Sequence, residues 1–223
     1  MTMKDLSITQ EYMMLAVNEK GVLSAYNQKA IACLIVGGLA EMQMEGCIAM
    51  ENKKIAVCAE LPERISYLKP LYDIINRGKP VKPEKIMEAY TASFTNKNLN
   101  EFLNAIVNEL KAAEAVEPVK TGILGSKESY APKNAVITGI VEKIRAELLE
   151  DGEISEEVIA LTALLDKAGQ LKDYFSKYEQ KELKEKLSQI RNSDAAKTAK
   201  EAIQHIDALT ASVIAFTVIA SNV

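Results

Sequence analysis

The chain has 223 residues, of which 48% are hydrophobic and 26% are charged, and its formal net charge at pH 7 is −4. This balance is typical of a globular protein, and we expect one domain over residues 1–223. The acidic charge argues against a strong sequence-independent nucleic-acid binder and against tight, purely electrostatic attachment to anionic lipid.

The segment of residues 7–58 predicts two helices followed by a small β-hairpin. Ser7 and Gln10 have the spacing of a capping box, which begins the first helix. Gly21 closes the connection, and the second helix begins at about Asn27. Two short apolar runs, residues 47–50 and 55–58, follow Gly46 and flank a polar turn. The second helix carries a buried stripe with helical spacing, made of Ile31, Leu34, Ile35, Gly38, Leu39 and Met42.

The remaining chain predicts more helices and one further hairpin. We expect helices over residues 70–78 and 84–92, and a third that Asn98 caps. Pro118, Gly122, Gly125 and Pro132 punctuate short apolar pieces and indicate a second hairpin. Four more helices follow, near residues 134–151, 155–169, 177–192 and 194–221. The predicted fold class is therefore mainly α, a single helical domain with two small β-hairpins.

Neither the cysteines nor the histidine form a pattern typical of catalysis or metal binding. The spacing of Cys33, Cys47 and Cys58 matches no zinc site, and we expect three buried thiols in a reducing cytoplasm. His205 is the only histidine, so no His-based triad or His-rich metal site can form. We expect no catalytic residue, no metal and no cofactor.

A helix–turn–helix before a hairpin is also the layout of a winged-helix DNA reader. A recognition helix needs exposed polar side chains that reach base edges, whereas the second helix here offers Leu34, Ile35 and Leu39. The basic residues of 181–191 alternate with glutamates at helical spacing, which favours a solvated helix face. We therefore expect no nucleic-acid partner.

The order and spacing of several short motifs resemble the Golgi phosphoprotein 3 family. The family's turn before its second helix corresponds to residues 18–21, and its aromatic–Asn pair corresponds to Tyr26 and Asn27. The end of that helix corresponds to residues 41–48, without a gap from Tyr26 to Glu41. The later helix over residues 155–171 is also similar to a family helix.

The resemblance implies a mainly helical, non-enzymatic module that is cytoplasmic and peripheral on a membrane surface. The family binds phosphatidylinositol 4-phosphate and holds the tails of membrane enzymes, so an anionic phospholipid headgroup and protein tails are the implied partners. The family's second hairpin serves in oligomer contact and membrane approach. The corresponding segment here runs from Val119 to Pro132 and implies a homo-oligomer contact.

In the family, an aromatic residue and an arginine of the second helix meet two basic residues of a later helix around the headgroup. Here Tyr26 keeps the ring, whereas Ile35 stands at the arginine position. The later pair falls near Asn100 and Leu103, and neither residue is basic. Lys29, one turn after Tyr26, and Lys97, before the later helix, are the candidates for substitute charge. The predicted phospholipid-binding residues are therefore Tyr26, Lys29 and Lys97.

Three alternatives stay open at this point. The loss of charge at Ile35 favours a protein-interaction scaffold without lipid affinity. An enzyme is a third reading, in which carboxylates such as Glu147 or Asp166 would be catalytic, although the sequence pairs neither of them with a nucleophile or a metal ligand. Finally, Tyr26 could simply pack the entrance of the second helix instead of touching a ligand.

Overall fold

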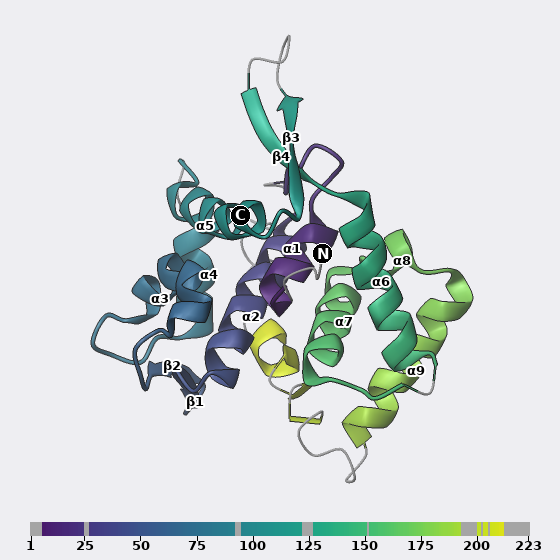
Figure 1. Cartoon of the computed structure of the whole chain (residues 1–223). Coiled ribbons are helices and arrows are strands. Elements are labelled where there is room, and N and C mark those ends of the chain that lie inside the picture. Colours follow the sequence, from purple (N-terminus) through teal and green to yellow (C-terminus); the bar gives the residue numbers. More distant parts are fainter. Residues whose placement is uncertain are drawn as a thin grey trace, which may run out of the picture.

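The computed structural model describes residues 6–24, 27–91, 95–121, 127–150, 152–192, 200–201, 203–204 and 206–211. The described chain is mainly helical, with two small antiparallel sheets of two strands each, as predicted (Figure 1). In chain order the elements are α1 (Ile8–Ala16), α2 (Gln28–Met44), β1 (Ile48–Glu51), β2 (Lys54–Val57), the 3₁₀ helix η1 (Glu63–Leu68), α3 (Lys69–Ile75), α4 (Pro83–Thr91), α5 (Lys97–Ala112), β3 (Val116–Thr121), β4 (Lys127–Pro132), α6 (Asn134–Leu148), α7 (Glu156–Ala168), α8 (Leu171–Tyr174) and α9 (Lys177–Asn192).

Helix α2 forms the centre of the molecule. Every residue from Ala30 to Met42 is buried, because α1 and α7 pack against one side of the helix and η1 against another. Gly38 of α2 permits the close packing of η1 and α3 against this helix. A Cβ atom added at Gly38 would lie only 2.8 Å from Leu71 Cδ2.

The predicted signals at several helix ends are confirmed. Ser7 and Gln10 form both hydrogen bonds of the capping box at the start of α1. The side chain of Asn27 accepts a hydrogen bond from the backbone N–H of Ala30 at 3.1 Å and caps α2. Ser155 caps α7 in the same way, through the N–H of Val158 at 3.3 Å. Gly46, just after α2, has the left-handed backbone expected there.

Two groups of helices flank α2. Figure 1 shows α3, α4 and α5 with the β1–β2 sheet on one side, and α6 to α9 on the other. The segment around Asp207 returns to the second group, where its carboxylate pairs with Lys167 and with Arg191, each at 2.8 Å. One continuous cluster of buried residues extends from Ile8 to Leu209.

The two hairpins differ in how they join the helices. The first continues directly from α2, and its strand β2 is also paired with Val81, since Ile55 and Val81 exchange both backbone hydrogen bonds at 2.8 Å. The second, β3 with β4, projects away from the helices in Figure 1. Its register runs from Val116 opposite Pro132 to Thr121 opposite Lys127.

The structure corrects two predictions. Asn98 does not cap α5, because the helix already begins at Lys97 and the Asn98 amide donates a hydrogen bond to the carbonyl of Ala89 at 2.7 Å. The three thiols are not all buried, because Cys58 follows the last residue of β2 and is exposed. His205, and residues 194–199, 202 and 212–221 of the helix expected over residues 194–221, lie outside the described residues.

Candidate ligand-binding cleft

The loop between α1 and α2 is built around Asn18. Its side-chain oxygen accepts hydrogen bonds from the backbone N–H groups of Lys20 at 2.9 Å and Val22 at 3.1 Å. Its backbone oxygen accepts another from Gly21 at 2.8 Å, so the chain turns sharply. Gly21 has a φ of +68°, and its backbone lies against that of Tyr130 in β4. The loop therefore has a defined shape and is packed on the base of the second hairpin.

The loop leads into the capped start of α2. The N–H of Asn27 donates to the carbonyl of Ser24 at 2.9 Å, and the carbonyl of Asn27 accepts from Ile31 at 3.1 Å. Asn27 is thus held from both directions at the end of the helix where the dipole is positive. Tyr26, the first of the predicted site residues, lies outside the described residues.

A cleft of about 660 Å³ opens beside this helix start. One wall is the end of α1 and the following loop, and the other is α8 with the residue before it. Tyr174 joins the two walls, because its hydroxyl donates a hydrogen bond to the carbonyl of Leu15 at 2.6 Å. The lining residues are Leu15, Ala16, Val17, Asn18, Glu19, Lys20, Val22, Ser24, Asn27, Gln170, Asp173 and Tyr174.

The charged side chains of the lining do not make the cleft basic. Lys20 supplies one positive charge to the lining, whereas Glu19 and Asp173 supply two negative charges. An anion in this cleft would therefore depend on the positive end of α2 and on cations beyond the lining. Within the part of the chain that the structure describes, no group of three or more His, Cys, Asp or Glu side chains is placed to hold a metal.

Comparison with known proteins decides the family. The model of the family described as Golgi phosphoprotein 3 (GPP34) matches residues 8–206, which is most of the chain. The chain belongs to the Golgi phosphoprotein 3 family. No curated protein matches it in the search of such proteins. Among the residues described for this family member, no helix has both the length and the apolar character needed to cross a membrane.

Lys29, a predicted site residue of this Golgi phosphoprotein 3 family member, is not among the described residues that line the cleft. It is exposed in the first turn of α2, two residues after Asn27. The positive charge of Lys29 acts on the thiol of Cys33, which lies one turn further along α2. Burial raises the pKa of Cys33 to about 12, while the Tyr12 hydroxyl, Lys167 and Lys29 oppose that rise. Lys29 therefore contributes positive charge near the first turns of α2.

Lys97 lies in another part of the molecule. It is exposed in the first turn of α5 and its ammonium lies 3.8 Å from the carboxylate of Glu101. The other end of α5 contacts the second hairpin, where Lys111 Nζ lies 4.2 Å from the centre of the Tyr130 ring. Lys111 is fourteen positions after Lys97 along α5, which corresponds to about 21 Å of helix. The structure does not place Lys97 among the described residues that line the cleft, and its role stays a prediction.

The position at which the resemblance implies an arginine is closed to solvent. Ile35 is completely buried in α2 and belongs to the hydrophobic core. Asn100 is exposed on α5, and Leu103 is partly buried and packed against the core. An isoleucine at this place contributes core packing, so any headgroup charge must be met by other residues.

Sequence reasoning missed the α8 side of the cleft. Gln170, Asp173 and Tyr174 follow the cleft's first wall by about 150 residues in the chain and belong to no motif. Their position depends on how the α7–α8 corner packs on α1, which includes a 2.8 Å hydrogen bond between the Tyr12 hydroxyl and Gln170 Oε1. In this part of the chain, the sequence predicted only that the preceding helix ends near Gly169.

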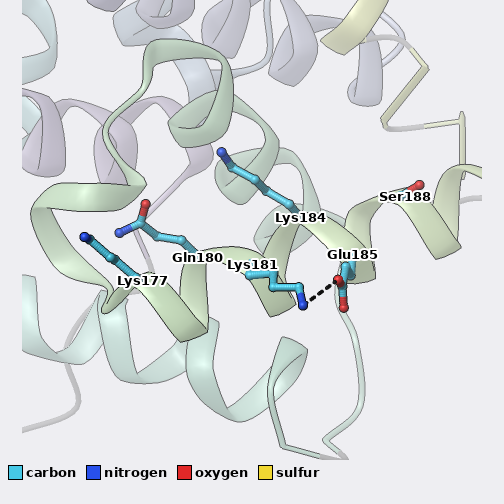
Figure 2. Close-up of a pocket in the computed structure, with 6 residues that line it drawn as sticks. All are labelled: Lys177, Gln180, Lys181, Lys184, Glu185 and Ser188. Atoms are coloured by element: carbon cyan, nitrogen blue, oxygen red, sulfur yellow. Dashed lines mark ion pairs between the residues drawn. The ribbon is translucent and has the colours of Figure 1, made fainter.

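A second hollow, of about 420 Å³, lies along the exposed face of α9 and is shown in Figure 2. Lys181 points to Glu185, at 3.7 Å, while Lys177 and Lys184 extend in other directions. Lys184 is 3.4 Å from Asp166 of α7. Because these ammonium groups diverge, the surface has the character of the solvated helix face that the alternating charges predicted.

Proposed function

We propose that this protein is a non-catalytic binding module that works at the cytoplasmic face of a membrane, with an anionic phospholipid headgroup bound in the cleft at the start of α2. The observation that carries the proposal is the opening of a 660 Å³ cleft beside the capped first turn of α2, in a chain whose family is Golgi phosphoprotein 3. Backbone N–H groups and the positive dipole end favour a phosphate at such a place.

The charges around the cleft predict a modest affinity. Lys20 and Lys29 would approach the headgroup phosphate, and Tyr26 would pack against it. Glu19 and Asp173 would repel it. A bidentate arginine supplies both charge and geometry to a phosphate, and Ile35 supplies neither. By resemblance to the family the headgroup is phosphatidylinositol 4-phosphate.

Flotation with liposomes tests the proposal. Vesicles of neutral phosphatidylcholine would be compared with vesicles that also contain phosphatidylinositol 4-phosphate, or phosphatidylserine at equal total charge. We expect the protein to float with the phosphoinositide vesicles at low salt, and Lys29→Glu to float at least several-fold less. Lys82→Glu, which changes an exposed lysine just before α4, is the matched control. No phosphoinositide-dependent flotation at low salt would reject lipid binding.

Two further substitutions test the other predicted site residues, Tyr26 and Lys97, one at a time. Tyr26→Ala should abolish flotation with little change in melting temperature if the ring contacts the ligand. A packing residue should instead cost about 3 kcal/mol or more of stability, as large-to-small core changes do. Lys97→Glu tests the second cation, and unchanged flotation would remove Lys97 from the site.

A second candidate function is a protein-interaction scaffold without lipid affinity. The burial of Ile35 and the carboxylates of Glu19 and Asp173 favour this reading, because they leave the cleft without a basic cluster. The partners would be protein tails, or a second copy bound through the second hairpin, Val119 to Pro132. A concentration-dependent sedimentation coefficient, together with absent flotation, would support the scaffold.

A further inference from the structure

Cys47 and Cys58 stand opposite one another at the open end of the first hairpin. The strand register pairs Ile48 with Val57, so the next pair outward is Cys47 with Cys58. The backbone N–H of Cys58 donates to the carbonyl of Cys47 at 2.8 Å, and that of Ala59 donates to the same carbonyl at 3.3 Å. The two cysteines are therefore held together by the backbone, independently of their side chains.

This arrangement already provides the backbone separation of a disulfide. Cys47 and Cys58 share one of the two backbone hydrogen bonds of an antiparallel pair, since the N–H of Cys47 donates to Met42 instead. Residues opposite one another in such a pair have Cα atoms about 4.5–5.5 Å apart. Disulfides need Cα atoms within about 4.4–6.8 Å. The thiols are free, and each is turned toward a nearby carbonyl, Cys47 to Glu45 at 3.9 Å and Cys58 to Ala56 at 3.8 Å. Both contacts are weak, so closure requires rotation of the two side chains and an approach of their Cβ atoms to about 3.5–4.5 Å.

The two thiols also differ in their exposure to solvent, so that one can react with an oxidant and the other with the product. Cys58 is exposed, whereas Cys47 is completely buried beside the core. Burial and the nearby Glu45 raise the pKa of Cys47, and Arg64 partly opposes this rise. Cys58 is therefore the thiol that an oxidant in solution reaches first, and Cys47 is the neighbour that can resolve the product. Cys33, at 0% exposure inside α2, is remote from this hairpin end in the chain and has no such partner position.

We propose that Cys47 and Cys58 are a redox-responsive thiol pair, which a hydroperoxide converts to a disulfide that ties the end of α2 to the segment after β2. The Cys58 thiolate attacks the peroxide, its sulfur is oxidised to a sulfenic acid, and hydroxide or an alkoxide leaves. The Cys47 sulfur then attacks the Cys58 sulfur, the S–S bond forms, and the sulfenic oxygen departs as water with the thiol proton. A small thiol reductant reverses the step.

The disulfide would lie at a junction of three elements. Cys47 follows α2, its own N–H donates to Met42 at 2.8 Å, and Ala59 accepts a hydrogen bond from the Tyr72 hydroxyl of α3 at 3.1 Å. Closure would thus brace α2, the hairpin and α3 without any large movement of the backbone. We expect the oxidised protein to melt at a higher temperature than the reduced one.

The test uses the full chain, reduced and then treated with a small excess of hydrogen peroxide. After quenching, the protein is unfolded and alkylated with N-ethylmaleimide, and its intact mass and its peptides are measured. We expect one alkylated cysteine, Cys33, and a peptide in which Cys47 and Cys58 are linked. The matched variants are Cys58→Ser, which changes an exposed thiol and should retain alkylation of both remaining cysteines, and Cys33→Ser, which should still form the link.

Three results would overturn the proposal. One is alkylation of all three cysteines in the treated wild type. Another is a Cys58 that carries added oxygen while Cys47 is alkylated. The third is a link between two chains through Cys58 in place of the internal disulfide.

Discussion

The carboxylate of Glu41 in α2 accepts a hydrogen bond from the backbone N–H of Thr9 in the first turn of α1. The same carboxylate accepts one from the Tyr67 hydroxyl, which lies 2.6 Å from the Ser7 hydroxyl. A buried carboxylate thus holds the capped start of α1 and η1 against α2. The arrangement uses the N–H groups that a helix start leaves unpaired.

Glu41→Gln should remove a pH dependence of stability. Burial raises the pKa of Glu41, although the hydrogen bonds from Tyr67, Thr9 and Ser7 oppose that rise. A glutamate with a raised folded-state pKa contributes stability that is fully present below its unfolded pKa of about 4.3 and is lost as the pH rises through the folded-state value. Glutamine mimics the protonated acid, so wild type should lose stability relative to Glu41→Gln as the pH rises from about 4 to 7.

Urea unfolding of both proteins at several pH values measures this difference. Groups other than Glu41 titrate alike in the two chains and cancel from the comparison. A constant difference between pH 4 and pH 7 would contradict the prediction. Glu41→Ala, which leaves the Thr9 and Tyr67 donors without this acceptor, should cost about 1–3 kcal/mol for each buried donor.

Local signals could be read from the sequence because their partners lie within one helical turn. The Ser7–Gln10 capping box and the Asn27 and Ser155 caps each join residues three apart, so their geometry follows from the helix itself. The apolar stripe of α2 was equally readable, because helical spacing alone determines which residues share a face. The mainly helical class with two hairpins followed from these signals.

Tertiary contacts explain what the sequence could not provide. Asn98 has the residue type of a cap, but its amide reaches Ala89 in the preceding helix, and α5 begins earlier at Lys97. The α8 wall of the cleft depends on contacts with α1 across about 150 residues. The exposure of Cys58 depends on where β2 ends. These three features depend on contacts in the folded protein, and no periodicity or spacing in the sequence indicates them.

Gly38→Ala should destabilise the protein relative to Gly37→Ala. A Cβ atom at Gly38 would lie 2.8 Å from Leu71 and 3.2 Å from Leu68, whereas one at Gly37 would have no neighbour closer than 3.4 Å. Alanine gains about 1 kcal/mol over glycine in a helix at either position. Overpacking costs about 1–3 kcal/mol.

The free energies of unfolding of these two variants should therefore differ by about 1–3 kcal/mol, with Gly37→Ala the more stable. Chemical denaturation measures both under one condition. Equal stabilities would show that Leu68 and Leu71 move aside without cost, and that the close approach of η1 and α3 to α2 does not require Gly38.

Glu179→Gln should lower stability at neutral pH and have little effect near pH 2. The guanidinium of Arg145 donates to Glu179 at 2.7 Å, and this bond, with further ones from Ser176, lowers the pKa of Glu179 to about 2. A lowered folded-state pKa contributes stability above the unfolded value of about 4.3, and the contribution is lost as the pH falls toward 2.

Thermal melts of wild type and Glu179→Gln from pH 7 to pH 2 test this expectation. Glu185→Gln is the matched control, because Glu185 lies on the same helix but is 58% exposed and 3.7 Å from Lys181. Exposed pairs contribute at most about 1 kcal/mol, so the control should change little at any pH. A Glu179→Gln deficit that persists undiminished at pH 2 would rule out the carboxylate's charge as its source.

Gly21→Ala should damage both stability and the cleft, and Gly78→Ala separates the causes. Both glycines have left-handed backbones, with φ values of +68° and +73°. An added Cβ at Gly21 would lie 1.9 Å from the carbonyl oxygen of Tyr130, whereas at Gly78 nothing lies within 4 Å. The left-handed backbone alone costs about 1–2 kcal/mol for alanine, and this is the loss expected at Gly78.

Gly21→Ala must in addition separate the loop from β4, so its loss in denaturant unfolding should be clearly larger. Because the same loop supplies Asn18, Glu19, Lys20 and Val22 to the cleft, Gly21→Ala should also reduce any phosphoinositide-dependent flotation, while Gly78→Ala leaves it unchanged. Equal losses of stability in the two variants would mean that the contact between the loop and the hairpin base does not hold the cleft in place.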